Sequence, residues 1–264
     1  MLTRQKDIRR FPSFGTMAVI CVTFLYGPIF FLMAYSFNEG RSISVWSGFS
    51  FRWYIKVFNN EDIQAATLNS LLVAAIAASI ATILAIGAAL ATTRHNKVKR
   101  SNAAYAFLNL PLIVPEIVSA VALLVFFVLI GLKLGLLSVI IAHTMFCIPF
   151  AYLPIRARLM SLDAELEAAA TDLYASPIQA FFHVTLPLLF QGILAGFLLA
   201  FIISLDDFII TSMVAGPGAT TLPLHIYSSL RLGVTPELNA ISSLLVVVSA
   251  ATVLISVFLS QSRK

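Results

Sequence analysis

Charged residues are scarce in this sequence. Asp, Glu, Lys and Arg make up only 11% of its 264 residues, whereas hydrophobic residues make up 59% and the mean hydropathy is +0.95. Soluble domains are about a quarter charged, so this composition excludes an ordinary soluble protein and predicts an all-α integral membrane protein. The apolar runs suit membrane helices, which need about 20 residues each, better than the strands of about ten alternating residues that build membrane barrels.

The patterns of metal, nucleotide and catalytic sites are also missing. Cys21 and Cys147 lie in apolar runs without CxxC or Cys/His spacing, so we expect no disulfide and no metal. His143 stands four residues before Cys147, but such a pair without a third ligand is typical of a structural role. The sequence has no GxxxxGK[ST] loop and no catalytic set in its soluble parts. We therefore expect no enzyme activity and no cofactor in this chain, and ATP-derived work would come from a partner.

The apolar material divides into six predicted transmembrane helices. They are residues 14–37, 65–92, 104–130, 134–155, 188–210 and 239–260. The first exceeds the apolar region of a signal peptide and no cleavage site follows it, so we interpret it as a retained helix. The second is rich in Ala, Ser and Thr, which favours close packing against partner helices. Residues 211–237 contain several Gly and Pro residues and are predicted to form a loop.

The positions of Lys and Arg predict the orientation. Of the 17 basic residues, 12 fall in the tail 1–13, in 94–100, at Arg156 and Arg158, and at the C-terminus. Under the positive-inside rule both termini are cytoplasmic. The net charge of +5 is thus explained by membrane topology, and it does not predict a nucleic-acid partner.

A short, largely polar segment from Asp163 to Pro187 interrupts the apolar pattern on the predicted cytoplasmic side. Its early acidic residues favour a helix start near Asp163. Ser176-Pro177 reads as an N-cap followed by a first-turn proline, so a second helix should run toward Val184 and end before Leu186-Pro187. The pattern predicts either a docking hairpin or a connecting loop that happens to be helical.

Three acidic residues lie in or beside apolar runs: Glu116, Asp206 and Asp207. A carboxylate at the bilayer centre costs about 2.5–3.5 kcal/mol, so each should face a cavity or lie near the interface. Glu116, close to two prolines, is predicted to line a pathway at a broken helix. Adjacent helical residues point about 100° apart, and the sequence does not decide whether Asp206 or Asp207 faces a cavity or whether the pair reaches outer water. Acidic groups without buried basic partners favour a positively charged solute.

The hairpin carries a family pattern, which is Glu-Ala-Ala, three residues, Gly, nine residues and Ile-x-Leu-Pro. The matching positions are Ala169, Ala170, Asp172, Leu173, Ala175, Ser176 and Leu186-Pro187. The chain thereby resembles the permease subunit of a type I ATP-binding-cassette (ABC) importer. Two positions depart from the pattern, because Ala168 replaces the family's glutamate and Tyr174 replaces its glycine. Tyrosine in a left-handed turn costs about 1 kcal/mol or more, which favours a turn built differently.

A closer resemblance covers nearly the whole chain. Stretches such as VWSGFSFRWY, PLIVPEIVSAVALLVFFVLIGLKLG, AHTMFCIPF and SLDDFIITSMVAGPG are similar in order and spacing to the spermidine/putrescine (PotC-like) importer permeases. The resemblance implies one six-helix permease domain over residues 1–264, with a coupling loop at 157–187, in a bacterial inner membrane. It also implies as partners a second, PotB-like permease, two copies of an ATPase that carries ATP and Mg, and an external polyamine-binding protein.

The same resemblance implies roles for individual residues. Those of the substrate pathway are Trp53, Tyr54, Glu116, Asp206 and Asp207. Those that couple to the ATPase are Asp163, Glu165, Glu167, Ala168, Ala169, Asp172, Tyr174, Ala175 and Ser176. Trp53 can alternatively be an interface anchor. Import of another amine such as 4-aminobutyrate stays open, and so does an ion-coupled secondary transporter, although we see no convincing internal repeat of the kind such transporters carry.

Overall fold

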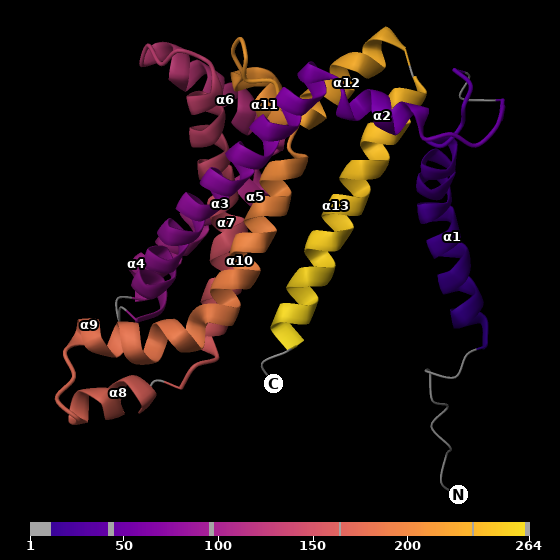
Figure 1. Ribbon diagram of the computed structural model, residues 1–264. Coiled ribbons are helices and arrows are strands. Elements are labelled where there is room, and N and C mark those ends of the chain that lie inside the picture. The colour runs from indigo at the N-terminus through magenta and orange to yellow at the C-terminus, as the bar shows by residue number, and fades with distance from the viewer. Residues whose placement is uncertain (1–11, 42–44, 95–97, 164, 234, 262–264) are drawn as a thin grey trace, which may run out of the picture. The chain divides into compact units, whose positions relative to one another are not determined.

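The computed structural model describes residues 12–41, 45–94, 98–163, 165–233 and 235–261 (Figure 1), and these residues are almost entirely helical. Contacts divide the chain into two compact units. One comprises residues 1–59 and 229–246, and the other comprises residues 60–228 and 247–264. The prediction that residues 1–264 form a single permease domain stays a prediction.

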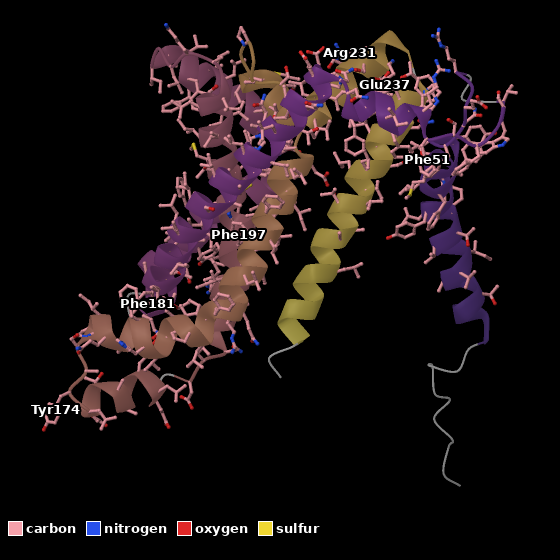
Figure 2. The ribbon with its side chains drawn as sticks, viewed as in Figure 1. Phe51, Tyr174, Phe181, Phe197, Arg231 and Glu237 are labelled. Carbon is pink, nitrogen blue, oxygen red and sulfur yellow. The ribbon has the colours of Figure 1, made fainter. Side chains whose placement is uncertain are left out.

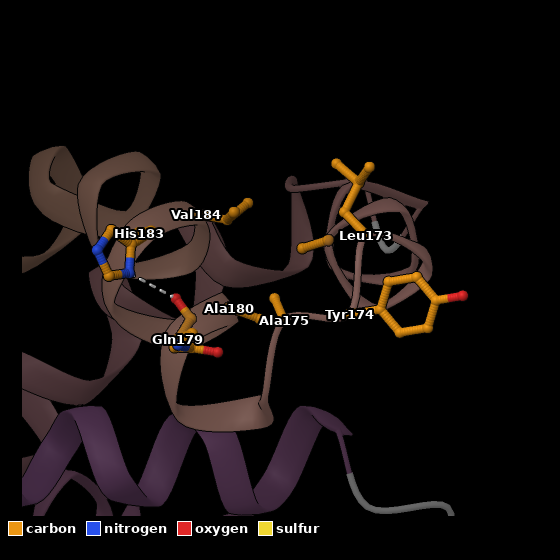
Figure 3. Close-up of a pocket in the computed structure, with 8 residues that line it drawn as sticks. Leu173, Tyr174, Ala175, Gln179, Ala180, His183 and Val184 are labelled. Carbon is orange, nitrogen blue, oxygen red and sulfur yellow. Dashed lines mark hydrogen bonds between the residues drawn. The ribbon is translucent and has the colours of Figure 1, made fainter.

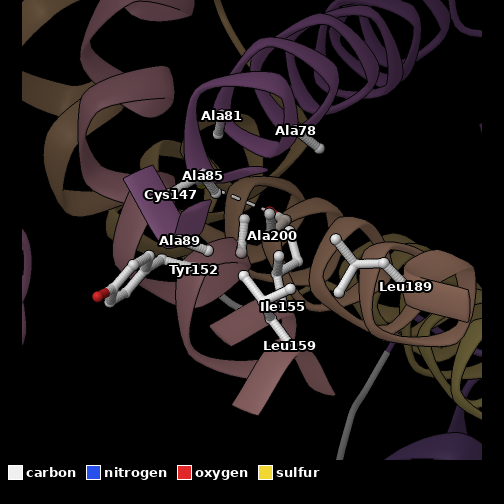
Figure 4. Close-up of a cluster of buried hydrophobic side chains, with 11 residues drawn as sticks. Ala78, Ala81, Ala85, Ala89, Cys147, Tyr152, Ile155, Leu159, Leu189 and Ala200 are labelled. Carbon is white, nitrogen blue, oxygen red and sulfur yellow. Dashed lines mark hydrogen bonds between the residues drawn. The ribbon is translucent and has the colours of Figure 1, made fainter. Parts of the chain in front are cut away.

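The core of the larger unit is built from three long helices, α3 (Glu61–Arg94), α7 (Leu136–Met160) and α10 (Leu186–Asp206), which contact one another pairwise. Small side chains on α3 allow this close approach. The fully buried alanines of α3 at its centre are Ala78, Ala81, Ala85 and Ala89, and Figure 4 shows them facing side chains of α7 and α10. The prediction of a tightly packed second helix is confirmed.

Glycine on α10 serves the same packing. A Cβ atom added to Gly196 would lie 2.6 Å from the carbonyl oxygen of Ala151 on α7, and one added to Gly192 would lie 2.6 Å from the Cβ atom of Arg158. Real Cβ atoms do not approach other atoms this closely, so only glycine fits at these positions. The backbones of α7 and α10 can therefore meet along this contact.

The third predicted helix, over residues 104–130, is interrupted. It is divided into α4 (Val98–Leu108), α5 (Leu110–Ile113) and α6 (Glu116–Leu129). Val114 has an extended backbone with ψ of 133°, because the residue before a proline is pushed out of the helical region. The break at Val114-Pro115 places Glu116 at the start of α6, and the predicted broken helix is confirmed there.

The second helix of the hairpin does not end before Leu186-Pro187, so that boundary was wrong. Helix α9 (Pro177–Ala180) passes into a π-helical turn, η2 (Phe181–Thr185), which continues directly into α10. A proline inside an α-helix lacks one hydrogen bond and clashes with the carbonyl four residues earlier. The wider π-helical turn just before Pro187 relieves this conflict locally, and the helix continues through it.

The predicted loop at residues 211–237 is also largely helical. It contains most of α11 (Ile209–Val214), α12 (Leu222–Leu232) and the first turn of α13 (Pro236–Gln261). Pro223 is the second residue of α12, and Pro236 is the first residue of α13. Proline costs nothing at these positions because the first N–H groups of a helix have no partner within it. The prolines mark helix starts rather than a structureless loop.

The smaller unit contains α1 (Pro12–Tyr35), α2 (Arg52–Phe58), the last residues of α12 and the first part of α13. Most described side chains of α1 are exposed and apolar, as expected for a helix in lipid. Lys56 on α2 forms an ion pair with Glu237 on α13, and Figure 2 labels Glu237 near the start of that helix.

Four described helical stretches are long and apolar enough to cross a membrane. They are Gly15–Tyr35, Glu61–Arg94, Leu136–Met160 and Pro177–Asp206, and two shorter apolar stretches are Glu116–Leu129 and Pro236–Ala251. The chain is thus a multi-pass membrane protein. The count of six spans is consistent with these stretches and stays a prediction.

Candidate functional site

The centre of the candidate site is Asp207, at the break between α10 and α11. Its backbone is extended, with φ of −65° and ψ of 129°. The carboxylate accepts hydrogen bonds from the backbone N–H groups of Ile210 (3.2 Å) and Thr211 (2.9 Å) and from the Thr211 hydroxyl (3.0 Å). Aspartate satisfies the free N–H groups of a helix start in this way. Asp207 therefore follows the last residue of α10, and its side chain satisfies N–H groups in the first turn of α11.

His143 on α7 joins the same network and is only 1% exposed. Its Nε2 atom lies 2.8 Å from Thr211 Oγ1 and 3.0 Å from Asp207 Oδ2, and its Nδ1 atom lies 2.8 Å from Ser204 Oγ. The hydroxyl of Thr211 donates to Asp207 and an ionised carboxylate only accepts, so we place a hydrogen on Nε2. One ring thus links α7, α10 and α11.

Sequence reasoning favoured a structural role for His143 over a metal site but did not identify its partners. A signal was present, since Ser204, Asp207 and Thr211 share one helical stripe. A buried polar stripe needs a polar partner on the neighbouring helix, and His143 is that partner.

Glu116, at the start of α6, is half-buried and lies near the Asp207 carboxyl group, because α6 packs against α11. The side chain of Asp206 is exposed instead. Of the three predicted acidic residues, the structure therefore brings Glu116 and Asp207 together and places Asp206 outside the buried network. Asp207 thus points into the helix packing, and which aspartate faces a cavity stays open.

Trp53 and Tyr54, the two aromatic residues predicted for the pathway, lie on α2 in the smaller unit. Trp53 is 5% exposed, and its Nε1 atom donates to the carbonyl oxygen of Asn38 (2.7 Å). The cationic groups of Arg52 and Lys56 lie 5.6 and 5.7 Å from the Trp53 ring centroid. The Tyr54 hydroxyl shares a hydrogen bond of 2.6 Å with Ser36 Oγ. Both residues hold local structure, and their contact with substrate stays a prediction.

The predicted hairpin is present, and its first helix is α8 (Glu165–Asp172). The Asp163 carboxylate accepts from the N–H group of Glu165 (3.0 Å). At the far end, the N–H groups of Ala175 and Tyr174 donate to the carbonyl oxygens of Ala170 (3.0 Å) and Thr171 (2.9 Å). These two bonds define a Schellman motif.

Tyr174 occupies the left-handed position of this motif, with φ of +63°, and it is the one non-glycine residue with positive φ in the described part of the chain. The expectation of a turn built differently was wrong. The turn keeps the form that suits glycine, and Tyr174 accepts the strain. Its side chain is 98% exposed and stands at the tip of the hairpin (Figure 2).

Two further contacts hold the hairpin. Ser176 and Gln179 form a reciprocal capping box at the start of α9, with distances of 2.8 and 3.4 Å, which confirms the predicted N-cap. Glu167 Oε1 accepts from Arg94 Nη2 at the end of α3 and from Thr185 Oγ1 in η2, both at 2.9 Å. Glu167 therefore fixes α8 to the helices behind it.

The remaining predicted coupling residues are on the outside of the hairpin. The exposed ones are Asp163, Glu165, Ala168, Ala169, Asp172, Tyr174 and Ser176, while Ala175 is half-buried. A pocket of about 350 Å³ lies between the two arms (Figure 3). Its lining comprises Ala170, Leu173, Tyr174, Ala175, Gln179, Ala180, His183 and Val184. The hairpin thus offers exposed side chains beside a small hollow.

Residues 81–263 match the family model of the binding-protein-dependent transport system inner membrane component. The chain belongs to this family. Members are transport components of membranes, so the chain is a permease subunit and not an enzyme. The family match covers the hairpin, the Asp207 network and α13.

Named relatives extend the match over most of the permease. It is 41% identical to the putrescine transport system permease protein PotI of Escherichia coli K12, over 84% of this chain and 82% of that relative. It is 37% identical to the spermidine/putrescine transport system permease protein PotC of Haemophilus influenzae, over 92% of this chain and 95% of that relative. The predicted PotC-like family is confirmed.

A solved structure shows the same fold. It is a chain in the crystal structure of a bacterial ABC transporter involved in the import of the acidic polysaccharide alginate, with a TM-score of 0.77 over 98% of both chains and 19% identity. The predicted ABC-importer permease fold is confirmed.

Proposed function

We propose that this permease is the transmembrane subunit of an ATP-driven importer that carries polyamines such as putrescine and spermidine into the cytoplasm. The observation that carries the proposal is the identity of 37–41% to PotI and PotC over most of their length. Relatives this similar share a fold, and the contacts of Glu116 and Asp207 give the proposal a chemical basis in this chain.

The proposed cation site is the pair Glu116 and Asp207. Two ionised carboxylates only accept hydrogen bonds, so their close approach requires a proton or a cation between them. A protonated amine can supply both the positive charge and several N–H donors. Asp206, exposed one residue away, offers a further negative charge for the other end of an extended polyamine.

Trp53 and Tyr54 stay in the proposal as aromatic residues of the substrate pathway. Cations are attracted to aromatic faces by about 0.5–2 kcal/mol. The Arg52 and Lys56 side chains beside the Trp53 ring make Trp53 the weaker candidate of the two.

The hairpin is the proposed contact with the ATPase. Arg94 lies at the end of α3 and bonds to Glu167, and Arg158 in the last turn of α7 donates to the Leu188 carbonyl oxygen. Basic residues and the hairpin thus share one end of the larger unit, while α6 and α11 lie at the other (Figure 1). This distribution supports a cytoplasmic hairpin and an outward position for the Asp207 network.

The assembly that follows from the proposal has four kinds of component besides the lipid bilayer. A PotB-like permease pairs with this chain, two ATPase copies bind ATP and Mg at the hairpins, and an external binding protein delivers the polyamine. The complex lies in a bacterial inner membrane with both termini of this chain in the cytoplasm. ATP-driven closure of the ATPases then switches the permease pair between inward-open and outward-open states.

The proposal is tested by reconstituting the complex in nanodiscs and measuring ATP hydrolysis with a panel of amines and the binding protein. We expect putrescine and spermidine to stimulate hydrolysis. Stimulation by 4-aminobutyrate alone would refute polyamines as the substrate but would still support an ATP-driven importer. Transport that needs an ion gradient and no ATP would contradict the proposal as a whole.

A further inference from the structure

We propose that His143 is the positioning residue of the carboxylate pair: its ring holds Asp207 at the break between α10 and α11, and through Asp207 it fixes the place of Glu116. The role of the pair in transport rests on the proposed function. The holding of Asp207 and α11 rests on this chain's geometry alone.

The first support is the location of the ring. His143 is 1% exposed on α7, and both of its nitrogen atoms lie 2.8–3.0 Å from polar partners on α10 and α11 and at the break between them. A buried polar side chain is costly to place in a membrane helix unless it is fully paired. His143 is fully paired, and its partners are the residues that shape the helix break.

The second support is the way the Asp207 oxygens are shared. Oδ2 accepts from the Thr211 N–H group and the Thr211 hydroxyl and lies 3.0 Å from His143 Nε2, whereas Oδ1 accepts from the N–H group of Ile210. A carboxylate oxygen has about two lone-pair positions, so Oδ2 is saturated while Oδ1 keeps capacity for Glu116 or a cation. The donors on Oδ2 thus set the direction in which Oδ1 is presented.

The third support is that two helix breaks meet at this point. Glu116 begins α6 after the break at Pro115, and Asp207 lies between the end of α10 at Asp206 and the start of α11 at Ile209. Helices α6 and α11 contact each other, and α11 contacts α7. Without the Nε2 contact, the Asp207 carboxylate would keep its bonds from Ile210 and Thr211 but lose its link to α7, so the break would be held less firmly against that helix.

Two amide substitutions separate this role from simple packing. The terminal amide of glutamine reaches the place of Nε2, whereas the shorter asparagine reaches the place of Nδ1. His143→Gln therefore keeps a donor to Asp207, and His143→Asn keeps only the contact with Ser204. Thr144→Val is the matched control on α7, because the Thr144 hydroxyl donates to the Ile140 carbonyl oxygen and lies outside the network.

Uptake of labelled putrescine is measured with each variant in the full complex and divided by the amount of assembled complex. We expect His143→Gln and Thr144→Val to stay within about twofold of wild type and His143→Asn to lose about tenfold, which equals about 1.4 kcal/mol. In a Glu116→Gln background, which alone should also lose about tenfold, His143→Asn should cause no further loss, because the two residues act as one unit. A loss of uptake of about a hundredfold in the double variant would mean that the two residues act independently, and this would overturn the proposal. Equal uptake by His143→Gln and His143→Asn would also overturn it.

Hydrogen exchange of the peptide covering α11 gives a second readout that needs no substrate. The N–H groups of Ile210 and Thr211 should exchange faster in His143→Asn and remain protected in His143→Gln. If the wild-type complex imports no putrescine, the proposed substrate fails, and the exchange data still decide whether His143 holds Asp207. Unchanged protection in His143→Asn would refute that role.

Discussion

Replacing Tyr174 by glycine should make the hairpin more stable. Tyr174 holds φ of +63°, a region that costs a non-glycine residue about 1 kcal/mol and glycine almost nothing. Its side chain is 98% exposed, so little packing in this chain is lost on removal. The backbone bonds that close the turn, from Ala175 and Tyr174 to Ala170 and Thr171, should therefore open about fivefold less often in Tyr174→Gly.

Alanine is the matched control for this prediction. Tyr174→Ala also removes the phenol ring but keeps the strain, so it should leave the stability of the turn close to that of wild type. The assay is hydrogen exchange of the N–H group of residue 175 in the purified complex and in the chain alone. Equal exchange in the Gly and Ala variants would refute the claim of stored strain.

The same pair tests why tyrosine stands at this position. If the exposed ring contacts the ATPase, Gly and Ala variants should both reduce co-purification with it, although only the Gly variant stabilises the turn. Loss of binding despite a more stable hairpin would assign the contact to the side chain. Unchanged co-purification in both variants would place the docking contact elsewhere on the hairpin.

Three further predictions concern packing, the hairpin and topology. Gly196→Leu should reduce the yield of folded complex in size-exclusion chromatography, because the Ala151 carbonyl oxygen occupies the space that the new Cβ atom needs. Such overpacking costs about 1–3 kcal/mol. The control variant Gly87→Leu should not reduce the yield, because the space beside Gly87 is open. Glu167→Ala should speed hydrogen exchange throughout α8 by removing the acceptor of Arg94 and Thr185, a loss of about 1–2 kcal/mol, and equal exchange would contradict this. A topology reporter fused after Lys264 should report a cytoplasmic location, and an external location would contradict the predicted orientation.

The sequence predicted helix packing best where small side chains indicate it directly. The alanine-rich pattern of residues 65–92 predicted close packing, and the buried alanines of α3 show it. Composition alone also predicted the membrane environment, because nothing else stabilises so many apolar side chains outside a core.

Prolines were the main source of error. Pro223 and Pro236 stand in the first turns of α12 and α13, where they are easily accommodated, and Pro187 is tolerated by the π-helical turn before it. Pro115 does break a helix. A proline is compatible with a helix start, a bulge or a break, and only tertiary contacts select among these.

The sequence predicted the acidic residues of the candidate site but not how they are arranged in space. The sequence identified Glu116 and Asp207 as costly acidic groups, but their proximity depends on how α6 packs against α11. The polar stripe of Ser204, Asp207 and Thr211 predicts a polar partner on a neighbouring helix, but periodicity does not identify it as His143, which stands 64 positions before Asp207. The form of the Tyr174 turn was mispredicted because the strain is small compared with what the rest of the hairpin contributes.

The central claim is tested most directly by transport in proteoliposomes that contain this permease, its partner permease, the ATPase and the binding protein. Labelled putrescine should accumulate only when ATP is present on the ATPase side, and an ionophore that collapses ion gradients should not abolish accumulation. Accumulation driven by an ion gradient without ATP, or import of 4-aminobutyrate in place of polyamines, would contradict the account.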